Sequence, residues 1–377
     1  MDRADVIIIG GGVVGCAIAY ALSSSWDHVF VLEALPRPGM LTSTRNSGVI
    51  HSGIYYPPGS LKARHCVRGN RLMYEFCVVN SVPHKNIGKI VVASSPGQEN
   101  ELVALMENGG ANGVEGLRLI DRAAIRAREP HVEGCCALEV PSTGILSSED
   151  LVKTFARLAA DRGAHILKNA RVERLEPLRD AVRVTSAAGE IETRSLVNSA
   201  GLFADDVAAM LGSSMARHTI YPVRGEYCEL VRSKQDWVRG LVYPLPHAAG
   251  LSLGTHLTKT LSGNVLVGPT ARYIKDKNDY ESDRESVDDF ARSTQLLLPD
   301  IVASDLVPAY SGIRPKLIAP SSPSVQAHGK GMADFIIERD PQFPCVVHLM
   351  GIESPGLTSA PAIAEHVMRL VTEILNN

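Results

Sequence analysis

Asp5-Val-Ile-Ile-Ile-Gly-Gly-Gly-Val-Val-Gly15 reads as a short strand that runs directly into a glycine-rich turn. Residues 16–22 then have the composition of a helix, and residues 29–33 that of a second strand ending in an acid, Glu33. A strand, a glycine turn, a helix and a strand in this order are typical of a dinucleotide-binding unit. Glu33 also follows the turn at close to the roughly 20 residues at which such units place an acid for ribose hydroxyls. The stretch therefore predicts that the chain binds a dinucleotide.

The glycines of this turn have separate mechanical roles. Gly10 allows the tight turn, Gly12 lets the backbone approach a pyrophosphate, and Gly15 lets the helix pack closely on the strand. The helix N-terminus offers unpaired N–H groups and a partial positive charge to the phosphates. An acid rather than an arginine at position 33 favours FAD or NAD over NADP. The residues of this unit expected against the cofactor are Gly10, Gly12, Val13, Val14, Gly15, Glu33 and Ala34.

The composition is that of a soluble globular enzyme. The 377 residues suffice for two connected domains with a large core. A formal net charge of −3, from 38 basic and 41 acidic residues, argues against a broad basic face, so we expect no nucleic-acid partner.

Cysteine usage and the N-terminus bear on the compartment. The seven cysteines form no Cys-x-x-Cys pair and no zinc spacing, so we expect free thiols in a reducing compartment and no metal site. The apolar run at the N-terminus is too short to span a membrane. It follows Asp2 and Asp5 rather than a basic segment, unlike a signal peptide. We therefore expect a cytoplasmic enzyme, and peripheral contact with the inner face of a membrane stays open.

The order of the remaining elements indicates an α/β protein with two domains, one assembled from discontinuous pieces. Helices are expected at 61–80, 99–109, 121–129, 147–162 and 359–375. Strands are expected at 88–94, 137–141, 164–167, 170–175, 195–201, 334–338 and 346–350, with a hairpin over 182–187 and 190–194 and a β-rich region over 221–270. We assign residues 1–80, 145–215 and 310–377 to a Rossmann-like domain, into which a β-sheet-rich substrate domain of residues 81–144 and 216–309 is inserted.

Five further strings occur in a recognisable order. They are Thr-Ser-Thr-Arg-Asn-Ser-Gly-Val-Ile-His-Ser-Gly-Ile-Tyr-Tyr at 42–56, Asn-Ser-Ala-Gly at 198–201, Gly-Thr-His-Leu-Thr at 254–258, Gly-Ile-Arg-Pro at 312–315 and Gly-Ile-Glu-Ser-Pro-Gly-Leu-Thr at 351–358. With the opening turn, they resemble the D-amino-acid oxidase/glycerol-3-phosphate dehydrogenase superfamily of FAD enzymes. Over nearly the whole chain the similarity is greatest to the L-2-hydroxyglutarate dehydrogenase-like branch, whose most specific marker is the string at 46–56. Members of this branch often carry histidine where this chain has Arg45.

The resemblance implies a non-covalent FAD and oxidation of a small L-2-hydroxy acid, such as L-2-hydroxyglutarate, to the 2-oxo acid by hydride transfer to flavin N5. The alternative on the same fold is oxidation of an amino acid or secondary amine of the glycine, sarcosine or D-amino-acid type. Either oxygen or a quinone can serve as the electron acceptor. An RNA-modifying flavoprotein is disfavoured by the charge balance, and an NAD-linked reductase by the single glycine fingerprint.

This reaction needs a cation for the substrate carboxylate and a base for its hydroxyl proton. A guanidinium pairs with a carboxylate through two hydrogen bonds, and Arg314 matches the position of the superfamily's substrate arginine. Lys316 lies two residues on, on the same strand face, where it could meet a distal carboxylate. His51 is the leading base, because an imidazole titrates near neutral pH. His256 would reach the flavin from the β-rich domain.

Two tyrosines and one further arginine are secondary candidates. Alternation along a strand would send Tyr55 and Tyr56 to opposite faces, so we expect only one of them, Tyr56, to contact the substrate. Arg224 is interpreted as the structural partner of a neighbouring acid rather than as a second anion contact.

The resemblance also places residues against the cofactor. Residues 44–47 are expected near the flavin and pyrophosphate, the backbone of Val172 near the adenine, and Gly201 near the phosphates. The backbone N–H groups of 353–358, at the start of the last helix, are expected to meet the isoalloxazine and stabilise negative charge on it. The residues assigned in this way are Thr44, Arg45, Asn46, Ser47, Val172, Ala200, Gly201, Gly312, Arg314, Gly351, Glu353, Ser354, Pro355, Gly356, Leu357 and Thr358.

Overall fold

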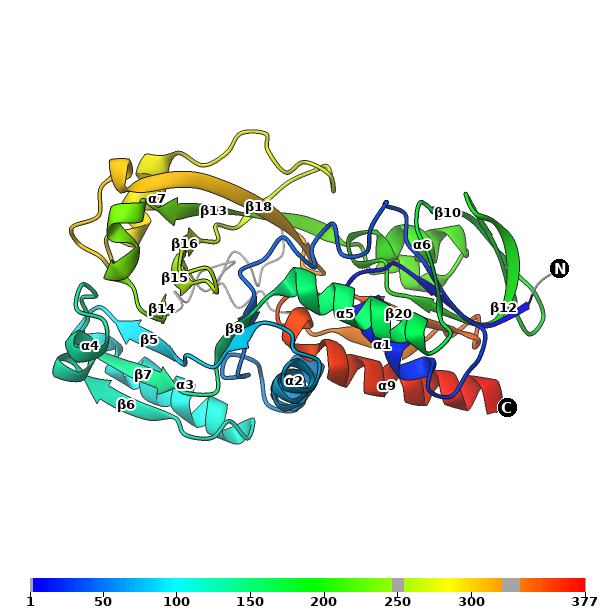
Figure 1. Ribbon diagram of the computed structural model, residues 1–377, viewed down its shortest axis with the longest axis horizontal. Helices are drawn as coiled ribbons and strands as arrows, with labels where there is room; N and C mark the ends of the chain where they lie inside the picture. The colour runs from blue at the N-terminus through cyan, green and yellow to red at the C-terminus, as the bar shows by residue number, and fades with distance from the viewer. Residues whose placement is uncertain (1–2, 246–253, 321–332, 377) are drawn as a thin grey trace.

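The computed structural model describes residues 3–245, 254–320 and 333–376. Figure 1 shows two lobes, with β12, β20, α1, α5 and α9 in one and β5, β6, β7, β13 and α7 in the other. Both chain termini lie at the first lobe. The predicted α/β class, with a Rossmann-like unit and a second, sheet-rich part, is confirmed.

The first lobe is built on an eight-stranded sheet with the path β10-β11-β12-β1-β2-β9, in which β20 pairs with β12 and β19 with β20. Its strands are β1 (Arg3–Ile9), β2 (Val29–Leu32), β9 (His165–Leu167), β10 (Val172–Pro177), β11 (Val182–Ser186), β12 (Gly189–Asn198), β19 (Ile336–Arg339) and β20 (Val346–Met350). β1 pairs in parallel with both β2 and β12. It therefore lies in the interior of the sheet, as its nearly continuous apolar sequence requires.

Helices cover both faces of this sheet. Alternate side chains of β1 point to opposite faces, so Val6 and Ile8 belong to one core cluster and Ile7 and Ile9 to another. The first cluster includes α1 (Val13–Leu22), α2 (Leu61–Val79), α5 (Ser148–Asp161) and α9 (Gly356–Asn376). The second includes Val207 of α6 (Ala204–Met210).

The second lobe contains a nine-stranded sheet with the path β17-β13-β16-β15-β14-β5-β7-β6, in which β18 pairs with β13. Its strands are β5 (Lys89–Ala93), β6 (Arg118–Asp121), β7 (Cys136–Val140), β13 (Tyr221–Leu230), β14 (Leu241–Pro244), β15 (His256–Lys259), β16 (Val265–Gly268), β17 (Arg272–Tyr273) and β18 (Leu306–Lys316). Three helices accompany it: α3 (Glu99–Ala111), α4 (Arg122–Arg128) and α7 (Val287–Thr294). Part of the predicted β-rich region, residues 246–253, lies outside the described residues.

A three-stranded sheet lies in the chain segments that connect the lobes. It has the order β3-β8-β4 and consists of β3 (Val49–Ile50), β4 (His84–Lys85) and β8 (Gly144–Leu146). β18 runs from Leu306 to Lys316 and so crosses the boundary that we predicted at residue 310. The division of the chain into domains at the predicted boundaries remains a proposal.

The prediction of two separate strands over 190–201 is wrong. The hairpin strand at 190–194 and the buried strand at 195–201 form one strand, β12, from Gly189 to Asn198. Its first half pairs antiparallel with β11, and its second half lies parallel to β1 and β20. The polar residues of 190–194 suggested an exposed hairpin, but no turn residue separates them from the apolar run that follows.

Candidate functional site

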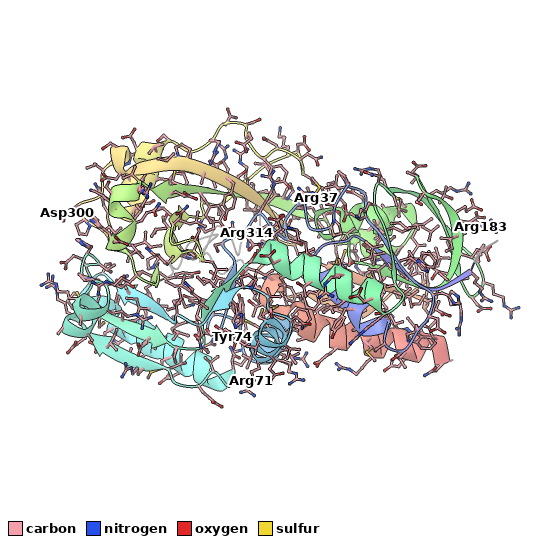
Figure 2. All side chains as sticks on the ribbon, viewed as in Figure 1. Arg37, Arg71, Tyr74, Arg183, Asp300 and Arg314 are labelled. Carbon is pink, nitrogen blue, oxygen red and sulfur yellow. The ribbon has the colours of Figure 1, made fainter. Side chains whose placement is uncertain are left out.

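A cavity of about 810 Å³ extends from the β1–α1 turn to the sheet of the second lobe. Its wall takes residues from segments far apart in the chain, including the turn itself, residues 39–56, residues 199–203, strands β13, β14, β15 and β18, and the loop before α9. Figure 2 labels Arg314 in the middle of the molecule, between the two lobes.

The β1–α1 turn has the close backbone packing that its glycines predict. Gly10 has φ of +100°, and a Cβ there would lie 2.7 Å from the Ser199 carbonyl oxygen. A Cβ on Gly15 would lie 2.0 Å from the Gly10 carbonyl oxygen. Gly12 is the N-cap of α1, and the next N–H, that of Val13, donates to Ser43 Oγ at 2.9 Å. Positions 10 and 15 therefore have no room for a side chain, and the backbone of the turn packs directly on its neighbours.

Glu33 stands at the end of β2, where it buttresses the turn. Its two carboxylate oxygens accept from the Gly11 and Leu35 N–H groups, each at 2.8 Å. Burial raises the pKa of Glu33, and these backbone donors oppose that shift. A carboxylate has about four acceptor positions, so Glu33 retains capacity for a ribose hydroxyl.

Most of the residues predicted to bind cofactor or substrate line this one cavity. Predicted residues in its wall are Gly10, Gly12, Val13, Val14, Glu33, Ala34, Arg45, Asn46, Ser47, His51, Tyr56, Val172, Ala200, Gly201, His256, Gly312, Arg314, Lys316, Glu353, Ser354, Pro355, Gly356 and Leu357.

Four predicted residues lie behind the wall. Gly15 packs on Gly10, and Gly351 packs on Leu317 with φ of +68°. The Thr44 hydroxyl donates to the Gly39 carbonyl. The Thr358 hydroxyl donates to the Val49 carbonyl and accepts from the His51 N–H, so it fixes the backbone of the histidine.

His51 presents a neutral imidazole to the cavity. Burial, together with the positive charge of Lys89, lowers the pKa of His51 to about 3. Its Nε2 lies 3.3 Å from the hydroxyl of Ser354, which also lines the cavity. The carbonyl oxygen of His51 accepts from the Asn70 amide at 2.9 Å, which holds this segment in place from α2. The ring is therefore neutral at pH 7 and free to accept a proton, but a pKa of about 3 makes it a weaker base than the near-neutral imidazole that we predicted.

His256 lies on a tyrosine. Its ring stacks on the ring of Tyr243 with 3.6 Å between centroids and 8° between planes. Both rings line the cavity, Tyr243 from β14 and His256 from β15.

Three guanidinium groups, those of Arg45, Arg171 and Arg314, line the cavity without an ion-pair partner among the residues that the structure describes. Arg314 donates from Nη1 to the Thr270 carbonyl at 3.2 Å. Arg45 lies over the Tyr280 ring at 4.3 Å from its centroid, and its Nη1 is 3.4 Å from the Ser311 carbonyl. Because the positive charges of Arg45 and Arg314 are uncompensated, both arginines favour an anion in the cavity.

Lys316 occupies a different environment from the one we expected. We predicted that it could meet a distal substrate carboxylate, whereas its Nζ pairs with Glu353 Oε2 at 3.0 Å. Glu353 also pairs with Lys62, through Oε1 at 2.9 Å, and all three side chains are buried. Burial alone would raise the pKa of Glu353, but the two ammonium groups hold it at about 2. This Lys62–Glu353–Lys316 triad therefore carries a carboxylate between two ammonium groups at the cavity wall.

The loop before α9 uses part of its backbone internally. The Glu353 N–H, which we expected to meet an isoalloxazine, donates to the Gly351 carbonyl at 2.8 Å. Donors of the first turn of α9 follow this loop, at Leu357 and beyond.

The interpretation of Arg224 as a structural residue is confirmed. Its side chain is fully buried and pairs with Glu226 at 2.9 Å and with Asp279 at 3.1 Å. The premise for the two tyrosines is wrong, because Tyr55 and Tyr56 lie in a turn rather than a strand, and both line the cavity.

The sequence analysis did not identify two lysines of the site. Lys62 lies in α2 and Lys89 at the start of β5, and both are buried. Neither belongs to a motif, and lysines in such positions are usually solvated. The available signal was the position of Lys89 at the start of an otherwise apolar strand, Lys-Ile-Val-Val-Ala.

The cavity begins at the dinucleotide turn and is closed by the sheet of the second lobe. This arrangement is that of a nucleotide-dependent redox enzyme. Residues 5–370 match the model of the FAD dependent oxidoreductase family, to which the chain belongs. It is therefore an FAD-dependent oxidoreductase.

The similarity to known proteins extends over nearly the full length of the chain. The chain is 35% identical to a mitochondrial L-2-hydroxyglutarate dehydrogenase of Arabidopsis thaliana, covering 97% of this chain and 83% of that protein. It is 32% identical to the L-2-hydroxyglutarate dehydrogenase of Escherichia coli K12, covering 98% and 94%. Among solved structures, FAD-bound L-alpha-glycerophosphate oxidase from Mycoplasma pneumoniae matches with a TM-score of 0.87 at 26% identity, over 99% of this chain and 95% of that one.

The residues present fit FAD. The glycine turn and the N-terminus of α1 suit a pyrophosphate, and Glu33 suits a ribose. The cavity continues from this turn to His51 and Arg314, so one extended ligand can reach from the nucleotide unit to the polar groups of the second lobe.

Proposed function

We propose that this protein oxidises L-2-hydroxyglutarate to 2-oxoglutarate. The observation that carries the proposal is the near-full-length similarity to L-2-hydroxyglutarate dehydrogenases of a plant and of bacteria. The cavity supports it, because a neutral imidazole and an uncompensated guanidinium line the same wall. These are the two groups that removal of hydrogen from a 2-hydroxy acid requires.

The residues of the chain act on the substrate in two ways. Arg314 binds the carboxylate next to the reacting carbon and fixes the orientation of that carbon. His51 accepts the hydroxyl proton at Nε2, and the Ser354 hydroxyl and the backbone bond to Thr358 hold its ring in position. FAD supplies the hydride acceptor when it is bound. Tyr56, Tyr243 and His256 line the cavity, and we expect these aromatic side chains to limit the access of water to the reacting carbon.

The partners proposed for this reaction are small molecules. The substrate is a small carboxylate, no nucleic acid takes part, and oxygen or a quinone reoxidises the cofactor. No helix among the described residues is long and apolar enough to cross a membrane. Cytoplasmic location with peripheral contact at a membrane, where a quinone would be reached, is part of the proposal.

The test is anaerobic bleaching of the flavin absorption band. We expect L-2-hydroxyglutarate to bleach the purified holoenzyme and the D-enantiomer not to. Arg314→Ala should raise the concentration needed for half-maximal bleaching by about 100-fold, because a charge-assisted bidentate pair contributes on the order of 3 kcal/mol. Arg314→Lys keeps the charge but loses the bidentate geometry. Its concentration for half-maximal bleaching should lie between those of the unsubstituted protein and Arg314→Ala.

Other outcomes separate the alternatives. Bleaching by glycine, sarcosine or a D-amino acid and not by hydroxy acids would move the protein to amine oxidation. Bleaching by glycerol 3-phosphate alone would keep an alcohol substrate and exclude a hydroxy acid. A purified protein that neither carries nor takes up FAD would contradict the cofactor assignment.

A further inference from the structure

Lys89 is a buried cation for which the described part of the chain, residues 3–245, 254–320 and 333–376, provides no carboxylate partner. Its exposed fraction is 0%. Its Nζ lies 4.5 Å from the ring centroid of Tyr55 and 4.8 Å from that of Tyr243. Burial lowers the pKa of Lys89 to about 7. A buried amine held only by aromatic faces and a phenol destabilises a fold, so this position calls for a functional explanation.

Tyr55 connects this lysine to the cavity. The Nζ of Lys89 is 3.4 Å from Tyr55 Oη. An ammonium group only donates, so the phenol oxygen accepts this bond and its own proton points elsewhere. Tyr55 lines the cavity, whereas Lys89 lies behind it. The cavity is therefore offered a hydroxyl donor with a positive charge directly behind it, an arrangement that strengthens hydrogen bonds to anions.

The charge behind this donor comes from a different part of the sheet than Arg314. Lys89 stands on β5 and Arg314 on β18, and strands β14, β15, β16 and β13 lie between them in the sheet. Lys316, the other candidate for a second anion contact, already pairs with Glu353. The sheet thus places the Arg314 guanidinium in the cavity wall and the Lys89 ammonium behind that wall, on two separate strands.

We propose that Tyr55, with Lys89 behind it, binds the second carboxylate of a dicarboxylic hydroxy acid, at the end of the cavity away from Arg314. Tyr55 is then the contact residue, and Lys89 is a positioning residue that directs the tyrosine proton and supplies the charge. This assignment rests on the proposed function. The assignment adds to that function the residues that select a dicarboxylate over a monocarboxylate of the same chain length.

The experiment compares two substrates on the holoenzyme. L-2-hydroxyglutarate and L-2-hydroxyvalerate have the same five-carbon chain, but a methyl group replaces the distal carboxylate in the second. The variants are Lys89→Met, which keeps the length of the side chain, Tyr55→Phe, which keeps the ring, and the double variant. Lys85→Met, at an exposed lysine of β4, is the matched control. Anaerobic stopped-flow bleaching gives the apparent Kd and the limiting rate for each substrate.

We expect both single variants to weaken L-2-hydroxyglutarate binding at least tenfold while changing L-2-hydroxyvalerate less than twofold. The limiting rate should change little in Tyr55→Phe, because the contact is remote from the reacting carbon. Lys89→Met also removes a charge that lowers the pKa of His51, so it should change the limiting rate by the same factor for both substrates. The double variant should match the single variants, since Lys89 acts through Tyr55. A second readout needs no turnover: binding of glutarate to the oxidised holoenzyme, followed by the shift of its flavin spectrum, should weaken by the same factor.

Protein integrity is checked in the same samples. Because Met removes a buried charge, the melting temperature of Lys89→Met should equal or exceed that of the unsubstituted protein. The proposal would be overturned if the single variants weakened the binding of both substrates equally, or if they left the ratio of the two Kd values unchanged. It would also be overturned if the losses of binding free energy in the two single variants added up in the double variant. Loss of selectivity in Arg45→Met with none in Tyr55→Phe would overturn it as well, since Arg45 is another cation of the cavity without an ion pair among the described residues. Failure of the proposed function is distinct, because the unsubstituted holoenzyme would then be bleached by neither hydroxy acid.

Discussion

At the residue scale, the candidate site combines groups that belong to motifs with groups that do not. His51 and Arg314 lie in strings whose order along the chain is informative, so both could be predicted. Lys62 and Lys89 could not, because tertiary packing alone buries them beside residues distant in sequence, Glu353 for the first and Tyr243 for the second. The same holds for Lys316, whose position was predicted but whose partner was not.

The Lys62–Glu353–Lys316 triad makes a prediction about stability. Glu353→Gln would leave two buried ammonium groups facing each other without a carboxylate, and we expect a loss of about 3–5 kcal/mol in the free energy of unfolding. Lys62→Met leaves the Glu353–Lys316 pair intact and should lose less. Denaturant unfolding at pH 7 measures both. If Glu353→Gln lost less free energy than Lys62→Met, the carboxylate would not be what holds the triad together.

The pH dependence of this effect has a definite sign. The folded pKa of Glu353, about 2, lies below its ordinary value of 4.5. The stabilisation is therefore complete above pH 4.5 and is lost as the pH falls toward 2. The stability difference between the unsubstituted protein and Glu353→Gln should shrink over this window. A difference that is constant from pH 6 to pH 3 would contradict it.

At the element scale, periodicity and turn residues predicted most helices and strands. They did not predict which strands pair with one another in the sheets. β20 was predicted with its observed ends, Val346 and Met350, because it is a short, mostly apolar run between Pro344 and Gly351. β12 was divided in two because its two halves have different environments, one half-exposed beside β11 and one buried beside β1 and β20. A change of neighbours along one strand leaves no turn signal in the sequence.

The crossing of α2 and α9 gives a prediction at this scale. A Cβ on Gly69 of α2 would lie 2.4 Å from the Thr358 carbonyl oxygen and 2.8 Å from the Ser359 Cα, both in the first turns of α9. Gly69→Ala must therefore separate the helices where α9 adjoins the cavity, and we expect a loss of about 1–3 kcal/mol and weaker FAD binding. Fluorescence titration of the apoprotein with FAD and thermal melting measure the two effects.

Gly110→Ala is the matched control. Gly110 also lies in a helix, α3, but a Cβ there would meet no atom within 4 Å. Alanine has the higher helix propensity, so this variant should be neutral or more stable by up to about 1 kcal/mol. If Gly69→Ala behaved like Gly110→Ala, the close approach of the two helices would not limit the site.

At the scale of the whole molecule, each lobe has a core of its own, and a smaller buried cluster joins them through Ile313 of β18 and Met350 of β20. Val6, Ile8 and Ile18 belong to one cluster of the first lobe, whereas Ile90, Val242 and Leu257 belong to a cluster of the second. The cavity wall takes residues from both lobes. A ligand that fills this cavity therefore contacts both lobes, which are otherwise joined by β18, the three-stranded sheet and the connecting segments.

This arrangement predicts different effects for FAD and for ADP, which shares only the nucleotide half of FAD. A ligand at 100 times its Kd stabilises the state that it binds by about 2.7 kcal/mol. At that saturation ADP should stabilise only the first lobe, so the melting transition of the apoprotein should broaden or divide in two. FAD at the same saturation should give one transition, because it contacts both lobes. Calorimetry of the apoprotein with each ligand measures this, and a single sharp transition with ADP would show that the lobes already unfold together without the flavin.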